Sequence, residues 1–384
     1  MPPKTSPTPA PPSEIPDAVW KRKLAVTMAG VIDKILPRER VSRAASPLVE
    51  ELAVFLARPG KRVRPLLLLH SYRTFAGREP GEPVFGLAAA LELLHAFILA
   101  HDDVIDRSDE RSGLPTLHRA VESRLGVHHD RERVARSLAI VLGDMLFSGA
   151  QEVVLRSGFE PETCLRLARS LNEYMTQTGI GELEDVVFGA GDIGRISRTD
   201  VERMYWLKTT RYSIECPLVL GAIAAGVGRG VLDGIAAMSR PLGLAFQLRN
   251  DLNAFRQFEV SDAAVPDDFL EGKKTLLMAI AYEKLGETDR RLLQICLSQR
   301  PAGEATLSIL KELVTKSGAV NEAEAVLRAA LREGDERLEK LPVSEDHRAR
   351  LCSALRFLGM VVSCSTAAAS GPPSNHPTHT SRAS

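Results

Sequence analysis

The order of apolar and polar residues follows a helical period over most of the chain. Apolar side chains recur at spacings of three and four residues, whereas the strict alternation that is typical of half-buried strands is scarce. Glycine, proline or short polar clusters separate the periodic segments. The pattern therefore predicts an all-α protein, with long helices over five segments, which are 84–106, 133–154, 162–178, 201–225 and 232–255.

The two ends of the chain lack this pattern. Residues 1–17 are rich in proline, and residues 365–384 are small, polar and proline-containing, so both segments are predicted to be disordered tails. The simplest organisation is one helical-bundle domain over residues 18–364 between the two tails.

Composition and charge exclude several classes of protein. The formal net charge is +0, which argues against nucleic-acid binding because that function needs a basic excess. The N-terminus has no apolar signal segment, and no run of about 18 apolar residues predicts a membrane span. Cysteines occur singly, which is typical of reduced thiols in a cytoplasmic protein; they are Cys164, Cys216, Cys296, Cys352 and Cys364.

Three aspartates stand at the end of the first apolar segment. Asp102 and Asp106 are four residues apart and share a helix face, with Asp103 beside them. Carboxylates packed this closely repel one another. Mg²⁺ relieves that repulsion because it takes oxygen ligands from carboxylates, water and substrate phosphates. The alternative is a solvated acidic helix end that Arg107 and Arg111 neutralise.

Two basic clusters offer partners for an anion. Lys61 and Arg64 are three residues apart, and Pro65 is expected to open the following helix, so both cations suit a diphosphate at a helix start. Lys208 lies inside an apolar segment, where an unpaired ammonium is costly unless it faces an anionic cavity. The alternatives are ordinary surface charge for the first cluster and a lysine that extends to the helix edge for the second.

Seven short motifs occur in an order that resembles the trans-isoprenyl diphosphate synthases, also called the polyprenyl synthetase family, which includes geranylgeranyl and farnesyl diphosphate synthases. Each motif is weak alone, but the ordered set is specific, and the resemblance runs from about residue 59 to about residue 278. The motifs are GKRVRP at 60–65, HDDVID at 101–106, GLPTLH at 113–118, GELED at 181–185, KTTRYS at 208–213, FQLRND at 246–251 and EGKKT at 271–275.

The resemblance implies a bundle of antiparallel helices around a deep central cavity, usually in a homodimer. Two aspartate-rich motifs would face each other there and hold about three Mg²⁺ ions on an allylic diphosphate. Asp102 and Asp106 would bind metal with Asp103 in support. In the second motif Asp251 would take part in catalysis and Asn250 would be a metal ligand.

The same resemblance assigns the substrate contacts. The residues implied for the allylic diphosphate are Arg111, Lys208, Thr209, Gln247 and Lys273. The residues implied for isopentenyl diphosphate are Lys61, Arg64 and His95. Asp185 would lie just outside the metal ligands.

The implied reaction is a prenyl transfer in the cytoplasm that feeds terpenoid biosynthesis. Breaking the allylic C–O bond leaves a carbocation and diphosphate, and metal ions and cationic side chains stabilise the charge that develops on the leaving group. Apolar walls exclude water from the carbocation. The double bond of isopentenyl diphosphate then attacks the carbocation, and a proton is lost to the departing diphosphate.

Product length in this family follows the residues just before the first aspartate motif. Phe97 lies five residues before Asp102, and Ile98 lies four before. One bulky ring at that place resembles a floor that stops chain growth at C15 to C20. Ordinary helix packing explains a phenylalanine there equally well.

Three places depart from the family's pattern. Asn250 and Ala254 stand where the second motif usually has aspartates, so a third ion is expected to bind less tightly to the neutral amide. Ser112 replaces an arginine that would contact isopentenyl diphosphate, which weakens that site. Glu182 replaces the usual glutamine, either as an added negative charge near the metals or as a surface change.

These departures leave two alternatives open. One is a terpene synthase derived from this family, which would act on an allylic diphosphate alone. The other is a catalytically weak subunit that regulates an active partner. Asn250 and Ser112 favour the alternatives, whereas Lys61, Arg64 and His95 favour elongation.

Overall fold

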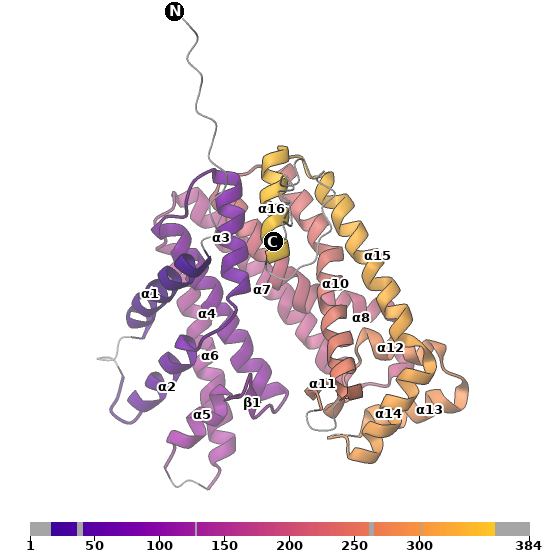
Figure 1. The fold of residues 1–384 in the computed structure, drawn as a ribbon. Helices are drawn as coiled ribbons and strands as arrows, with labels where there is room; N and C mark the ends of the chain where they lie inside the picture. The colour runs from indigo at the N-terminus through magenta and orange to yellow at the C-terminus, as the bar shows by residue number, and fades with distance from the viewer. Residues whose placement is uncertain (1–16, 37–40, 127–128, 261–264, 300, 358–384) are drawn as a thin grey trace, which may run out of the picture.

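The computed structural model describes residues 17–36, 41–126, 129–260, 265–299 and 301–357 (Figure 1). The predicted tails, 1–17 and 365–384, lie outside this part of the chain, except that residue 17 begins the first helix. The all-α prediction is confirmed, since the described strands are two short ones in a single hairpin.

The first half of the chain forms one side of the molecule (Figure 1). Its elements are α1 (Asp17–Ile35), α2 (Ser46–Ala57), α3 (Val63–Ala76), α4 (Glu82–Ile105), β1 (Glu110–Arg111), β2 (Leu114–Pro115), α5 (Leu117–Arg124), α6 (Arg131–Leu155) and α7 (Pro161–Ala190).

The second half continues through the centre to the other side. Its elements are the 3₁₀-helix η2 (Ile193–Arg195), α8 (Arg198–Tyr205), the π-helix η3 (Trp206–Glu215), α9 (Cys216–Ala224), α10 (Arg229–Val260), α11 (Asp267–Leu270), α12 (Leu276–Lys284), α13 (Glu287–Ser298), α14 (Glu304–Ser317), α15 (Ala319–Glu339) and α16 (Glu345–Phe357).

All five predicted long helices are confirmed, with differences at their ends. The helix predicted over 162–178 continues to Ala190 in α7, and the segment 201–225 is three consecutive helical pieces with a π-helix in the middle. The prediction that Pro65 opens a helix is wrong by two residues, because α3 begins at Val63.

Two hydrophobic cores hold the helices together. The larger core gathers buried side chains from α1 to α7, α9 and α16, and the smaller one gathers side chains from α8, α10 and α12 to α15. Helix α10 joins them, because Leu242 belongs to the first core while Leu248 and Phe255 belong to the second. The part of α10 between the two cores therefore faces the space where the two sides meet.

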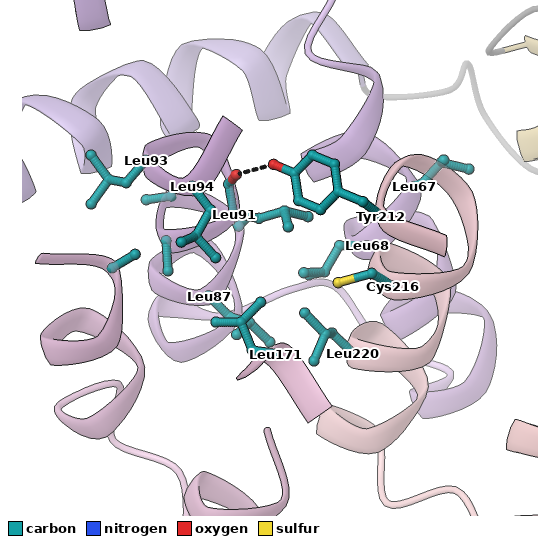
Figure 2. Close-up of a cluster of buried hydrophobic side chains, with 14 of the residues drawn as sticks. Leu67, Leu68, Leu87, Leu91, Leu93, Leu94, Leu171, Tyr212, Cys216 and Leu220 are labelled. Atoms are coloured by element: carbon teal, nitrogen blue, oxygen red, sulfur yellow. Dashed lines mark hydrogen bonds between the residues drawn. The ribbon is translucent and has the colours of Figure 1, made fainter. Parts of the chain in front are cut away.

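Helix α4 is the central element of the larger core. It packs against α1, α3 and α6, and Leu87, Leu91 and Leu94 are fully buried. Figure 2 shows these leucines beside Tyr212 of η3, whose hydroxyl donates to the carbonyl oxygen of Leu91 at 3.2 Å. A helix surrounded in this way is apolar on nearly all faces.

The apolar composition of α4 and α6 makes both helices long and apolar enough to cross a membrane by length and composition alone. The expectation that no long apolar segment exists therefore does not hold for these two helices. In α4, 67% of the apolar window is buried inside the protein, and in α6 the share is 39%. Burial in the bundle explains the composition of α4, so these helices do not by themselves show a membrane span.

The cysteines depart in part from their predicted state. Cys164, Cys216 and Cys296 are free and buried, as expected of reduced thiols. Cys352 of α16 is disulfide-bonded, so the prediction is wrong for this residue. Cys364 lies outside the described residues.

Candidate active site

The C-terminal end of α4 carries the three predicted carboxylates. Asp102 and Asp103 lie in the last turn of the helix, and Asp106 follows it directly. The backbone N–H of Asp106 donates to the carbonyl oxygen of Asp102 at 2.8 Å, which keeps the three residues in one turn. The C-terminal end of a helix is the negative end of its dipole, so carboxylates there need nearby positive charge.

Arg111 supplies the first positive charge. Its Nε donates to Oδ1 of Asp103 at 2.7 Å, and its Nη2 donates to Oδ2 of Asp102 at 2.8 Å. The β1–β2 hairpin presents it through a two-residue turn in which Ser112 and Gly113 have φ values of 55° and 74°. Burial raises the pKa of the Asp103 carboxyl, and the Arg111 guanidinium opposes that shift.

Lys208 of η3 supplies the second positive charge, between α4 and α7. Its Nζ lies 2.6 Å from Asp185, 2.9 Å from Glu182 and 3.4 Å from Asp102. Burial opposes the charge on Lys208, but Asp185, Asp102 and Glu182 together raise the pKa of its ammonium well above the ordinary value. The predicted anionic surroundings of this lysine are therefore present.

Two glycines allow η3 to lie close to its neighbours. A Cβ added to Gly181 of α7 would stand 2.3 Å from the backbone nitrogen of Lys208, and one added to Gly243 of α10 would stand 2.1 Å from the side chain of Thr210. Side chains at either glycine would push η3 away from α7 or α10. The π-helix η3 carries Lys208 to the carboxylates of α4 and α7. This agrees with the general observation that π-helical turns inside α-helices frequently mark functional sites.

Lys273 supplies the third positive charge from the turn between α11 and α12. Its Nζ donates to Oδ2 of Asp106 at 2.7 Å, and the Glu271 carboxylate lies 3.8 Å away. The preceding Gly272 has φ +58°, the left-handed conformation that glycine adopts without strain. The ammonium of Lys274 is buried and donates to the backbone carbonyl oxygens of three segments, those of Gly189, Gly272 and Leu297, which anchors this turn.

Some of these side chains line a cavity of 210 Å³. Its lining includes Asp102, Lys208, Thr209, Gln247 and Lys273 among the predicted site residues, and Asp185 beside them. A wider cavity of 860 Å³ shares Asp185 and Lys273 with it and also includes Asp106. The structure thus brings together Asp102 and Lys273, which lie far apart in the sequence.

Several side chains of this cavity were not predicted from the sequence, and the chemically most important of them are Tyr205 and Asp268. Burial raises the pKa of the Asp268 carboxyl, which Lys273 opposes and Asp185 reinforces. Asp268 stands shortly before the EGKKT motif, so its closeness to a motif was the only available signal. Tyr205 gave no signal, because one tyrosine in an apolar segment is equally typical of a core.

The second motif is arranged differently from the prediction. Asn250 is exposed and does not line the 210 Å³ cavity. Asp251 is buried, where the Tyr205 hydroxyl donates to it at 2.5 Å and the Gln247 amide donates to it at 3.2 Å. Burial raises the pKa of Asp251 to about 7, although both hydrogen bonds act in the opposite direction.

The residues predicted for isopentenyl diphosphate form a second group. Nη1 of Arg64 lies 3.2 Å from Nε2 of His95, and Nη2 donates to the Ser213 hydroxyl at 2.7 Å. Burial lowers the pKa of His95 well below its ordinary value, and Arg64, Arg111 and Arg62 lower it further. Arg111 and Arg62 pair with carboxylates, whereas the hydrogen-bond partners of Arg64 are the neutral His95 and the Ser213 hydroxyl, so the charge of Arg64 is available to an anion. Lys61 is exposed beside this group in the chain.

Phe97 lies on a different side of α4 from this chemistry. Its ring contacts His101 on the same helix and Phe147 of α6, with centroids 4.6 Å and 5.4 Å apart. It does not line the 210 Å³ cavity. These contacts place Phe97 at the packing surface between α4 and α6.

The donor set of the site fits magnesium. Within the described residues, no three acidic, histidine or cysteine side chains form a group that could hold an ion alone. Mg²⁺ at phosphate sites commonly takes one or two carboxylates and completes its shell with water and phosphate oxygens. Oδ2 of Asp103 and Oε1 of Glu182 are buried without a hydrogen-bond partner, so these acids retain oxygen atoms that could accept a ligand.

Comparison with known protein families and curated sequences gives one consistent result. The sequence profile described as polyprenyl synthetase matches residues 46–314. A geranylfarnesyl diphosphate synthase of Aeropyrum pernix is 31% identical over 300 residues, which are 77% of this chain and 88% of that protein. A short chain isoprenyl diphosphate synthase of Methanothermobacter thermautotrophicus is 30% identical over 319 residues, covering 81% of this chain and 91% of its own.

Solved structures show the same likeness in three dimensions. A geranylgeranyl pyrophosphate synthase from Corynebacterium glutamicum, complexed with isoprenyl diphosphate and magnesium, superposes with a TM-score of 0.80 at 27% identity, covering 89% of this chain and 99% of that one. A polyprenyl synthase from Caulobacter crescentus, complexed with calcium and isoprenyl diphosphate, gives a TM-score of 0.68 at 25% identity, covering 92% and 100%.

Proposed function

Because the chain belongs to the polyprenyl synthetase family and is a trans-prenyltransferase, we propose that it condenses an allylic diphosphate with isopentenyl diphosphate to a short-chain product of C15 to C20. One observation carries the proposal. Lys208 and Lys273 pair with carboxylates at the end of α4, and Arg64, held beside the neutral His95, offers a separate positive charge. A condensation of two diphosphates needs two such anion sites.

The first group suits the diphosphate that leaves. As the allylic C–O bond breaks, negative charge grows on the diphosphate oxygens, and Lys208, Lys273 and Arg111 are placed to stabilise it. Gln247 and Thr209 line the same cavity and can orient the phosphates through hydrogen bonds. Divalent metal, proposed as about three Mg²⁺ ions, supplies further positive charge on the leaving group when bound.

The second group suits the diphosphate that stays attached. Arg64 is fixed by Ser213 and by His95, and its guanidinium lies 4.9 Å from the centre of the Tyr212 ring. A guanidinium held in place loses little freedom when it binds a phosphate in bidentate fashion. Lys61 adds an exposed positive charge, which can offset part of the arginine lost at Ser112.

The two alternatives are not favoured by the relatives. The two curated relatives described above are named as diphosphate synthases, and so is a (2E,6E)-farnesyl diphosphate synthase of Mycobacterium tuberculosis at 28% identity. Neither the terpene synthase nor the weak subunit explains why the Arg64–His95 group is retained.

Incubation of the purified protein with Mg²⁺ and either geranyl or farnesyl diphosphate tests this proposal, with and without isopentenyl diphosphate. We expect longer diphosphates only when isopentenyl diphosphate is present. A hydrocarbon or alcohol formed without it would support a terpene synthase instead. No turnover in either mixture would support the regulatory subunit.

We also propose that the protein is a homodimer and that it is located in the cytoplasm. Large apolar side chains are exposed on the outer faces of two helices, and a second copy could cover them. They are Ile140 and Val141 of α6 and Ile180, Leu183 and Val187 of α7. The free thiols support a cytoplasmic location, whereas the disulfide at Cys352 does not.

A further inference from the structure

The second aspartate motif of this chain is poor in charge. Asn250 and Ala254 stand at two positions where the family has acids. The chain also has one acid more than the family's pattern elsewhere, since Glu182 replaces the usual glutamine. Whether that acid belongs to the site or to the surface depends on where α7 places it.

Helix α7 directs Glu182 into the site. Its Oε2 lies 2.9 Å from Nζ of Lys208, and the side chain is only 20% exposed. Its other oxygen, Oε1, is buried without a hydrogen-bond partner. Burial raises the pKa of the Glu182 carboxyl, Lys208 opposes that shift, and the Asp102 and Asp185 carboxylates reinforce it. A surface role is therefore excluded.

The charges of the site can be counted from its contacts. The carboxylates that line the 210 Å³ cavity or pair with its cations are Asp102, Asp103, Asp106, Glu182, Asp185, Asp268 and Glu271. The cations are Arg111, Lys208, Lys273 and Lys274. Seven negative charges against four positive ones leave an excess of three negative charges, to which Glu182 contributes one.

This excess of negative charge fits the number of divalent ions that the site is proposed to bind together with a diphosphate. An ionised diphosphate ester brings about three further negative charges, and about three divalent ions neutralise the sum. With a glutamine at position 182 the same ions would be one negative charge short. The family has that charge in its second motif, on the helix that is α10 in this chain.

We propose that Glu182 supplies, from α7, the negative charge for magnesium that the second aspartate motif of this chain lacks on α10. This inference rests on the proposed function, because it concerns the same metal–diphosphate complex. It predicts opposite effects on the two ligands. Glu182 strengthens the binding of Mg²⁺, and in the absence of metal it weakens the binding of diphosphate by repulsion and by occupying Lys208.

Isothermal titration of the full-length protein tests this prediction with inorganic diphosphate and Mg²⁺ as probes. In Glu182→Gln the dissociation constant for Mg²⁺, measured with diphosphate present, should rise about tenfold. Without metal, in EDTA, the same variant should bind diphosphate more tightly than the wild type. Equal Mg²⁺ constants in the two proteins would overturn the inference.

Two further variants separate charge from structure. Glu184→Gln removes an equal charge from the same helix, but Glu184 pairs with Arg203 outside the cavity, so the Mg²⁺ constant should not change. Glu182→Asp keeps the charge and should keep the Mg²⁺ constant within about threefold of the wild-type value. An equal loss in Glu184→Gln, or a full loss in Glu182→Asp, would contradict a specific role for the Glu182 charge.

A double variant tests whether the charge has moved between helices. Position 250 is exposed and lies three residues after Gln247, which lines the cavity, so an acid at position 250 would stand on the same side of α10 at the edge of the site. Asn250→Asp combined with Glu182→Gln should restore the Mg²⁺ constant that the single variant loses. Failure to restore it would refute the exchange between α7 and α10. A wild-type protein that binds no diphosphate with Mg²⁺ would instead refute the proposed function itself.

Discussion

At the scale of single residues, the carboxylates that the reaction needs stand where they are unfavourable for the stability of the fold. Asp102, Asp103 and Asp106 stand at the negative end of the α4 dipole, where acids are unfavourable. Lys208 reaches Asp102 from η3, and Lys273 reaches Asp106 from the α11–α12 turn. Arg111 pairs with Asp103, so each carboxylate has a cation in the absence of metal. When a diphosphate and metal bind, these lysines can change partner from carboxylate to phosphate without leaving the cavity.

The buried Asp251 carboxyl is expected to make the stability of the protein depend on pH. Its pKa is about 7 in the folded protein and higher than in the unfolded chain, so its contribution to stability is present at low pH and lost as the pH rises through 7. In EDTA, Asp251→Asn should therefore gain stability relative to the wild type, by roughly 2–3 kcal/mol between about pH 5 and about pH 8. Urea unfolding at several pH values measures this difference, and a constant difference across that range would contradict the buried, protonatable state of Asp251.

Phe97 allows a test of product length. If its ring is the floor of the product cavity, Phe97→Ala should lengthen the prenyl chain, by at least one isoprene unit. Its contact with Phe147 gives a matched control, because Phe147→Ala removes the packing partner and leaves the residue before the aspartate motif intact. Chain length is read by chromatography of the dephosphorylated products. An unchanged product in Phe97→Ala would leave the residue as a packing side chain only.

The sequence predicted Asp102 and Lys208 because an unusual charge within an apolar helix is visible without coordinates. Gln247 was predicted only from the motif that resembles the family. It did not predict Tyr205 or Asp268, because only the path of the chain brings α8 and α11 to the same cavity. The contact of Tyr205 with Asp251 was hidden for the same reason. A spacing rule acts along one helix, whereas these contacts join different helices.

At the scale of elements, the π-helix η3 positions the Lys208 side chain toward the carboxylates of the site. The periodicity predicted one helix over 201–225, which is correct in kind, but a π-helical stretch cannot be read from a pattern of apolar residues. Gly181 and Gly243 leave room for η3. Their importance is visible only in the structure, where a Cβ added to either glycine would overlap with Lys208 or Thr210 of η3.

A pair of glycine substitutions on α7 tests this role. Gly181→Ala would place a Cβ 2.3 Å from the backbone of Lys208, so it should destabilise the protein by about 1–3 kcal/mol and lower the rate of condensation. Gly179→Ala is the matched control, because a Cβ there meets nothing within 4 Å and should stabilise the helix by about 0.5–1 kcal/mol. Thermal unfolding and steady-state rates measure both effects. Equal behaviour of the two variants would show that η3 does not depend on the close approach of α7.

At the scale of the whole molecule, the site lies where two cores meet. Asp102 and Arg111 come from the side that the larger core holds, whereas Lys273 and Asp268 come from the side that the smaller core holds. Composition and periodicity predicted one helical domain, and they could not show that its apolar residues divide into two clusters joined by α10. The 210 Å³ cavity therefore lies between the helices of the larger core and those of the smaller core.

The exposed apolar residues of α7 predict the state of assembly. Leu183 is 63% exposed and Val187 is 58% exposed, one helical turn apart. If they form a homodimer contact, the double variant Leu183→Glu and Val187→Glu should be a monomer, as measured by light scattering after size-exclusion chromatography. Val26→Glu is the control, because Val26 is 75% exposed on α1 and should not affect assembly. A wild-type monomer, or a double variant that stays dimeric, would contradict the contact.

The central claim is that the carboxylates at the end of α4 enable the transfer of an allylic chain to isopentenyl diphosphate. The most direct test is the rate at which labelled isopentenyl diphosphate enters a longer prenyl diphosphate in the presence of farnesyl diphosphate and Mg²⁺. We predict incorporation by the wild type and a loss of about a hundredfold or more in Asp102→Asn, with the thermal stability of the two proteins compared to confirm folding. Incorporation by Asp102→Asn at the wild-type rate, or none by the wild type, would contradict the claim.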